Sequence, residues 1–129
     1  MSEKLRKVSD KAQFVETYHL LMKAANTYSF ISANIPNALL EVSQRIHGRF
    51  DDAAFNVFKA SNTFDNSCKL MCINTAKDDV FYQFNSLEYL VKTRAITTKA
   101  ANTVLDVLAE AHTQLTKWYN YLISHSESS

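Results

Sequence analysis

The chain has 129 residues, with 14 Lys and Arg against 13 Asp and Glu, so its formal net charge is only +1. This balance gives no global electrostatic argument for binding to nucleic acid or to an anionic membrane surface. There is one Gly and one Pro, whereas an average soluble domain has about 7% and 5% of these residues. A β-sandwich or an α/β fold needs more turn residues than that, so the sequence predicts an all-α fold.

Residues 1–129 are expected to form a single domain, with frayed ends at residues 1–8 and 125–129. No segment approaches the roughly 18 consecutive apolar residues of a membrane span, so we expect no membrane partner. Two cysteines and no apolar secretory segment predict a reduced, cytoplasmic protein.

The first predicted helix starts at Ser9, whose hydroxyl is a suitable N-cap, and continues to about Ala33. One apolar face recurs at steps of three and four residues, namely Phe14, Tyr18, Leu21, Ala25 and Tyr28. Pro36 then breaks the helix, because it excludes the α conformation at Ile35, and it is well suited to open the next helix.

The second and third predicted helices carry similar apolar stripes, separated by a turn over residues 61–66. Their stripes are Leu39, Val42, Ile46, Phe50, Ala53, Val57 and Ala60, then Leu70, Ile73, Lys77, Val80, Phe84, Leu87 and Val91. Gly48 lies inside the second helix at a cost of about 1 kcal/mol relative to Ala. Either a close helix approach or a bend would explain it.

The junction over residues 87–101 predicts that one helix ends and the next begins with almost nothing between them. Thr97 is the expected N-cap, and Ile96 and Ala101 stand where a hydrophobic staple would. The fourth stripe is Ala101, Leu105, Leu108, Leu115, Tyr119 and Leu122, ending near Ser124. Short connections make neighbouring helices antiparallel, so the prediction is an up-down-up-down four-helix bundle.

Sequence motifs for catalysis or metal binding are weak. Glu16 and His19 have the Glu-x-x-His spacing of di-iron bundles, but Glu110 and His112 are two positions apart and do not supply the second motif. Cys68 and Cys72 are too few ligands for a zinc site and are interpreted as packing residues. We therefore expect no catalytic residue, no metal and no cofactor, and a protein that is not an enzyme.

Lys77 and His112 occupy positions in otherwise apolar stripes, at similar depth in adjacent helices. The simpler interpretation is a paired polar layer in the core that sets the helix register. The alternative is a polar groove or an assembly surface.

Two surface features predict interactions. Aromatic residues exceed what the stripes need, which favours a homo-oligomer; they are Phe30, Phe55, Phe58, Tyr82, Tyr89, Trp118 and Tyr121. The bundle end that holds both termini collects seven cations against four carboxylates, an excess of three. Lys7, Lys11 and Lys117 at this end are candidate phosphate contacts.

Several distributed residues support a family resemblance. They are Ile35-Pro36, Arg45-Ile46, the Leu87, Leu90 and Arg94-Ala95-Ile96-Thr97 junction, Leu108-Ala109-Glu110, and Leu115 with Trp118. In these the chain resembles the accessory variability determinant of diversity-generating retroelements, from about residue 18 to residue 121. More loosely, it is similar to the four-helix-bundle proteins encoded in ribosomal RNA intervening sequences.

The resemblance implies a pentameric, non-enzymatic helical bundle that binds the element's reverse transcriptase and RNA or DNA, and so supports mutagenic retrohoming. It also implies residues that contact nucleic acid or the polymerase, namely Arg45, Arg49, Arg94, Lys99 and Lys117. A helical-bundle scaffold or adaptor of some other protein complex stays open as the alternative function.

Overall fold

Four α-helices and one short 3₁₀ turn make up the described part of the chain: α1 (Glu3–Ser32), η1 (Asn37–Leu39), α2 (Leu40–Asn62), α3 (Asn66–Lys92) and α4 (Thr98–Ser126). The computed structural model describes residues 3–126, with side chains from residue 10 to residue 125. This range contains no strand, so the all-α prediction is confirmed. None of its helices combines the length and the apolar character needed to cross a membrane.

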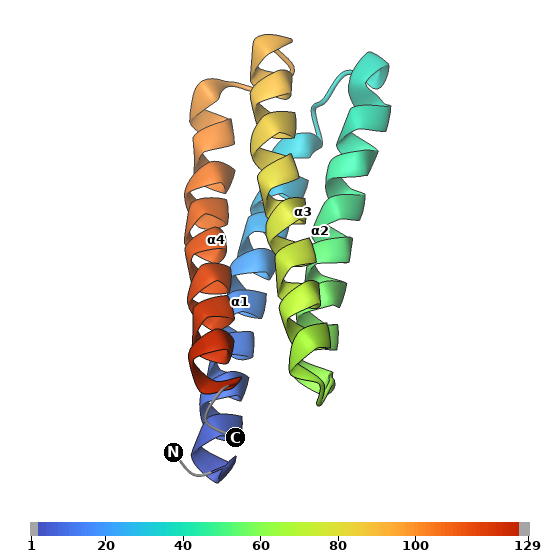
Figure 1. Cartoon of the computed structure of the whole chain (residues 1–129). Coiled ribbons are helices and arrows are strands. Elements are labelled where there is room, and N and C mark those ends of the chain that lie inside the picture. The colour runs from blue at the N-terminus through green and yellow to red at the C-terminus, as the bar shows by residue number, and fades with distance from the viewer. Residues whose placement is uncertain (1–2, 127–129) are drawn as a thin grey trace.

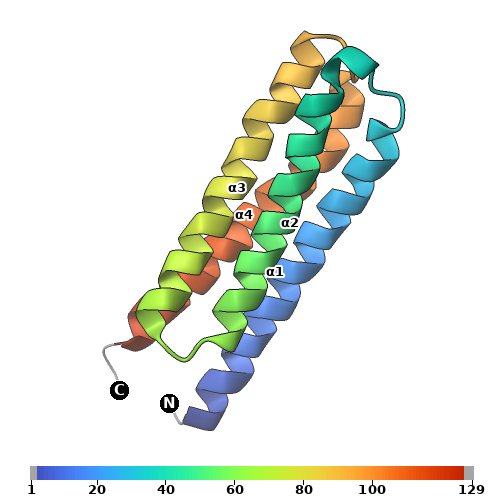
Figure 2. The same cartoon turned by 90° about the vertical axis from the view of Figure 1, so that its right-hand side faces the viewer.

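The helices form one layer of α1 and α2 against one layer of α4 and α3 (Figures 1 and 2). Each helix packs against its two neighbours, α1 on α2 and α4, and α3 on α2 and α4, while α1 and α3 lie on a diagonal. The chain reverses direction at every connection, and α1 begins at the end of the bundle where α4 stops (Figure 1). The predicted antiparallel four-helix bundle is therefore confirmed.

The junction between α3 and α4 also follows the prediction. Thr97 caps α4, since its Oγ1 accepts a hydrogen bond from the backbone N–H of Ala100 at 3.1 Å. Ile96 and Ala101 are both buried, as a hydrophobic staple requires. The backbone N–H groups of Arg94 and Ala95 donate to the carbonyls of Val91 and Leu90, which is the Schellman pattern that ends a helix.

Helix boundaries differ from the prediction at α1 and α2. The cap predicted at Ser9 is wrong: α1 already begins at Glu3 and so includes residues 3–8, which we expected to be frayed. Residues 3–7 contain no Gly or Pro that would interrupt the helix, so α1 extends on the N-terminal side of Ser9. Pro36 opens the 3₁₀ turn η1, and α2 starts only at Leu40. Residues 1, 2 and 127–129 lie outside the described range.

The buried faces of α1 and α4 are rotated by about one residue from the predicted stripes. Tyr18, Leu105 and Tyr119 lie at the flanks, and Trp118, expected among the surplus aromatics, is fully buried. The observed core positions of these two helices include Thr17, Leu21, Ala24 and Tyr28, then Val104, Leu108, Ala111, Leu115, Trp118 and Leu122. Small residues such as Ala24 and Ala111 let neighbouring helices approach closely, which a search for large apolar residues overlooks.

Candidate functional site

A shallow groove lies along α2 where it meets α3. Its volume is about 670 Å³, and it is lined by Glu41, Gln44, Arg45, Gly48, Arg49 and Asp52 of α2, with Tyr82 of α3. We call this the α2–α3 groove. A Cβ atom added at Gly48 would find no other atom within 4 Å. A close helix approach therefore does not explain Gly48, which lies at the lining of the groove.

Arg49 is held in a defined position at this groove. Its Nη1 donates to Oδ1 of Asp79 on α3 at 2.8 Å, and its guanidinium lies 4.3 Å from the centre of the Tyr82 ring. The hydrogen bond to Asp79 raises the pKa of Arg49. Despite these contacts its side chain is 43% exposed. Arg45, one helical turn earlier, is exposed and has no ion-pair partner among the described residues.

Behind Arg49, two buried acceptors lie one turn apart on α3. The Nε2 of Gln83 donates to the backbone carbonyl of Ile46 at 2.8 Å. Oε1 of Gln83 and Oδ2 of Asp79 have no hydrogen-bond partner within the described chain. Burial raises the pKa of Asp79, although the hydrogen bond from Arg49 opposes it. Only one oxygen of the Asp79 carboxylate therefore has a hydrogen-bond partner within the described chain.

A second surface is apolar and lies over α1 and α2. We call it the α1–α2 aromatic face; it consists of Phe14, Val15, Tyr18, Phe55 and Phe58. The Phe14 ring lies 5.7 Å from that of Tyr18 and 6.4 Å from that of Phe58, so the face continues from one helix to the other. Phe55 is 64% and Phe58 55% exposed. Phe30, Phe64 and Tyr89 are also exposed, but they lie elsewhere on the bundle.

The candidate cations do not form one cluster. Arg45 and Arg49 lie together at the α2–α3 groove. Arg94 lies in the turn after α3 and Lys99 in the first turn of α4, at one end of the bundle, whereas Lys11 of α1 lies at the opposite end. Lys117 is exposed on the last third of α4, and the side chain of Lys7 lies outside the described range.

Lys77 and His112 are half-buried at the flank where α3 meets α4, and not in the core where we expected a polar layer. The Nζ of Lys77 lies 5.7 Å from the centre of the Tyr119 ring. The pKa of His112 is lowered, first by burial and then by the charge of Lys77. The charge of Lys77 therefore adds to burial in disfavouring the protonated form of His112, and within residues 10–125 no hydrogen bond joins the two side chains.

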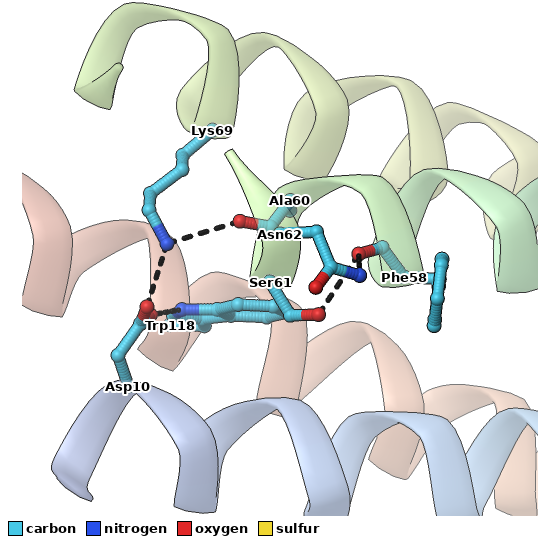
Figure 3. A network of polar contacts seen from close by, with 7 residues as sticks. All are labelled: Asp10, Phe58, Ala60, Ser61, Asn62, Lys69 and Trp118. Carbon is cyan, nitrogen blue, oxygen red and sulfur yellow. Dashed lines mark hydrogen bonds and ion pairs between the residues drawn. The ribbon is translucent and has the colours of Figure 1, made fainter. Parts of the chain in front are cut away.

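Besides Asp79, buried Lys69 belongs to a polar cluster that the sequence did not reveal (Figure 3). Asp10 points from α1 toward both Lys69 of α3 and Trp118 of α4, and Lys69 also donates to the carbonyl of Ala60 at the end of α2. Lys69 is one of the seven cations that the sequence places at the bundle end with both termini, but its side chain is buried. Lys69 precedes the buried residues Cys72, Ile73 and Ala76 by three, four and seven positions. This helical spacing indicates that Lys69 lies on the core face of α3.

No metal site is formed within residues 10–125, since no three His, Cys, Asp or Glu side chains lie together. Glu16 and His19 are exposed on α1. Cys72 is buried and Cys68 exposed. The packing role predicted for the two cysteines therefore applies to Cys72 alone.

Comparisons with known proteins give no identity: no family model, no curated protein and no solved structure matches this chain.

Proposed function

We propose that the protein is a non-enzymatic accessory bundle that assembles with itself through the α1–α2 aromatic face, and that the assembled form docks a protein partner. The observation that carries this proposal is the exposure of Phe55 and Phe58 beside Phe14 and Tyr18. A continuous apolar surface over two helices is uncommon on a monomer and marks protein interfaces. Aromatic side chains also dominate the energetics of such interfaces.

The resemblance supplies the candidate partner. It points to the reverse transcriptase of a diversity-generating retroelement, to a pentameric assembly, and to a role in mutagenic retrohoming. The four-helix fold and the capped α3–α4 junction are features that the resemblance leads us to expect, and in this sense they support the proposal. We place the activity in the cytoplasm, where the thiols of Cys68 and Cys72 stay reduced.

RNA or DNA is a secondary partner in this proposal. The candidate cations are spread over three regions, so no single basic surface would carry the binding. At the groove, Glu41 and Asp52 stand beside Arg45 and Arg49. This mixed charge favours a protein partner as the main one, and for the same reason a scaffold or adaptor of another protein complex is the second candidate function.

The test is co-purification with the reverse transcriptase of a diversity-generating retroelement. The double variant Phe55→Ser/Phe58→Ser removes two exposed rings and should abolish co-purification. The matched control is Phe30→Ser, which removes a ring that is 85% exposed on α1 and should leave it intact. Circular dichroism of both variants should match the wild-type protein, because exposed substitutions change stability by only about 0.5 kcal/mol.

Two results would redirect the proposal. If the double variant co-purifies as well as wild type, docking of the partner does not depend on assembly through the α1–α2 aromatic face. If no reverse transcriptase binds while the chain still assembles with itself, the second candidate function replaces the first.

A further inference from the structure

We propose that the surface between α3 and α4 receives the α1–α2 aromatic face of a second copy, so that the chain assembles head to tail through two different faces. This inference rests on the proposed function, because it names the surface that the α1–α2 aromatic face contacts. The receiving surface consists of Lys77, Phe81 and Phe84 of α3 with His112 and Tyr119 of α4, and we call it the α3–α4 flank.

The α3–α4 flank combines aromatic rings with two bases. The rings of Phe81 and Phe84 lie 6.5 Å apart, and Phe81 is 59% exposed. Lys77 precedes Phe81 by four residues, so both side chains lie on the same side of α3. The Nζ of Lys77 lies 5.7 Å from the centre of the Tyr119 ring, and its charge lowers the pKa of His112, so this side of α3 borders α4. A partner that covers the flank would bury aromatic area beside a positive charge.

Symmetry favours a second copy as this partner. An interface in which one face pairs with itself closes at two copies, whereas contact between two different faces continues from copy to copy. The two layers of the bundle, α1 with α2 and α4 with α3, each present one aromatic surface (Figure 2). Phe55 on the first layer is 64% exposed and Phe81 on the second is 59% exposed. The chain therefore offers two different apolar faces, as head-to-tail assembly requires.

Charge complementarity identifies the α1–α2 aromatic face as the occupant of the flank. Asp51 precedes Phe55 by four residues, which places its exposed carboxylate on the side of α2 that carries this ring. Neither Asp51 nor Lys77 has an ion-pair partner within residues 10–125. The carboxylate of Asp51 beside one face therefore matches the ammonium group of Lys77 on the other.

Asp51 and Lys77 also lie at the same height along the bundle. Arg49 of α2 lies beside Asp79 of α3, with 2.8 Å between Nη1 and Oδ1. Because the two helices are antiparallel, a step of two residues forward from Arg49 and two residues back from Asp79 reaches one common height, which is that of Asp51 and Lys77. Rotation about an axis parallel to the helices leaves heights unchanged. Copies related in this way bring Asp51 of one copy to the level of Lys77 of the next.

A mixture of two complementary variants tests the head-to-tail arrangement. Phe55→Ser/Phe58→Ser lacks the α1–α2 aromatic face, and Lys77→Glu/Phe81→Ser lacks the α3–α4 flank. Each variant alone should elute as a monomer in size exclusion with light scattering. An equal mixture should give a species of two chains and no larger one, because each variant keeps the face that the other needs. Formation of this mixed dimer also shows that both variants are folded.

Exchange of the two charges tests the contact between Asp51 and Lys77. Asp51→Lys and Lys77→Glu each place like charges opposite each other and should weaken assembly about tenfold or more. The double variant Asp51→Lys/Lys77→Glu restores opposite charges at every contact and should assemble within about threefold of the wild-type protein. Lys23→Glu, which reverses an exposed lysine elsewhere on α1, is the control and should assemble like the wild-type protein.

Three results would overturn the inference while the wild-type protein assembles: assembly of Lys77→Glu/Phe81→Ser, a mixture of the two variants that stays monomeric, or a charge exchange that assembles as weakly as the single reversals. These results leave the proposed function intact, because that function depends on Phe55 and Phe58. A monomeric wild-type protein, or assembly of Phe55→Ser/Phe58→Ser like wild type, would contradict the proposed function, and this inference with it.

Discussion

The Nζ of Lys69 lies 2.6 Å from Oδ2 of Asp10, and this ion pair joins α3 to α1 across a diagonal of the bundle. Asp10 also accepts a hydrogen bond from Nε1 of Trp118 on α4, and Lys69 donates one to the carbonyl of Ala60 on α2. All four helices meet in one polar cluster (Figure 3). A shift of any helix along its axis would break a hydrogen bond, so we infer that this cluster sets the helix register.

Lys69→Met should destabilise the protein by about 3 kcal/mol, because it leaves the carboxylate of Asp10 and the carbonyl of Ala60 without their cation. Urea denaturation followed by circular dichroism measures this loss. Lys59→Met, which removes an exposed lysine near the end of α2, is the control and should change stability by about 0.5 kcal/mol at most. Equal effects of the two substitutions would show that the cluster is not structural.

Arg94→Gly should stabilise the protein by about 1 kcal/mol, because a side chain in the left-handed region costs that much relative to glycine. Arg94 has a φ of +63° at the end of α3, where helices usually place Gly. Arg94→Ala removes the same charge but keeps the Cβ atom, so it should give no such gain. A thermal melt compares the three proteins. Equal stability of the Gly and Ala variants would contradict the backbone explanation.

Much of the bundle was predictable from residue spacing and turn chemistry. The junction from Leu87 to Ala101 was predicted in detail, since the cap at Thr97 and the staple of Ile96 with Ala101 depend only on neighbours in the sequence. Lys69 and Asp10 were missed because their partners are 59 positions apart in sequence. No local pattern reveals a contact across a bundle diagonal.

The candidate site was predicted only in part, because it too depends on contacts between residues that are distant in sequence. Arg45 and Arg49 were named from the resemblance, but Tyr82 and Asp79, which hold Arg49, come from another helix. Lys77 and His112 were expected in the core because they stand in apolar stripes. A small rotation of each helix moves such positions to the flank, and periodicity does not measure rotation that finely.

Asp79→Asn should remove a pH dependence of stability. Because the pKa of Asp79 is raised above 3.8 in the folded protein, the native state binds more protons than the unfolded state between 3.8 and that raised value. Wild-type stability from this group therefore increases as pH falls through the raised pKa. The variant lacks this gain, while its side-chain carbonyl can still accept the hydrogen bond from Arg49.

We therefore expect the variant to be the more stable protein at pH 7 and to lose that advantage toward pH 4. The electrostatic groups that act on Asp79 are Arg49 and Asp52 from α2 and Asp78 on its own helix. Urea denaturation at both pH values measures the difference. A difference that is constant with pH would contradict the assignment.

Lys77→Met should raise the pKa of His112 toward 6.5, because the charge of Lys77 is the second cause that lowers it. His112 has the opposite effect to Asp79: its folded pKa is depressed, so the protein loses stability as pH falls below 6.5. The Lys77→Met variant should lose less stability than the wild-type protein as pH falls below 6.5. An NMR titration of the imidazole gives the pKa directly, with Lys92→Met, an exposed lysine of α3, as the control. An unchanged His112 pKa would show that the two groups do not interact.

Self-assembly through the α1–α2 aromatic face is the central claim, and light scattering after size exclusion tests it most directly. The wild-type chain of 14.7 kDa should elute as a single oligomer, with five copies as the number implied by the resemblance. Phe55→Ser/Phe58→Ser should elute as a folded monomer and Phe30→Ser as the wild-type oligomer. A wild-type mass of one chain at micromolar concentration, or a double variant that assembles like wild type, would contradict the claim.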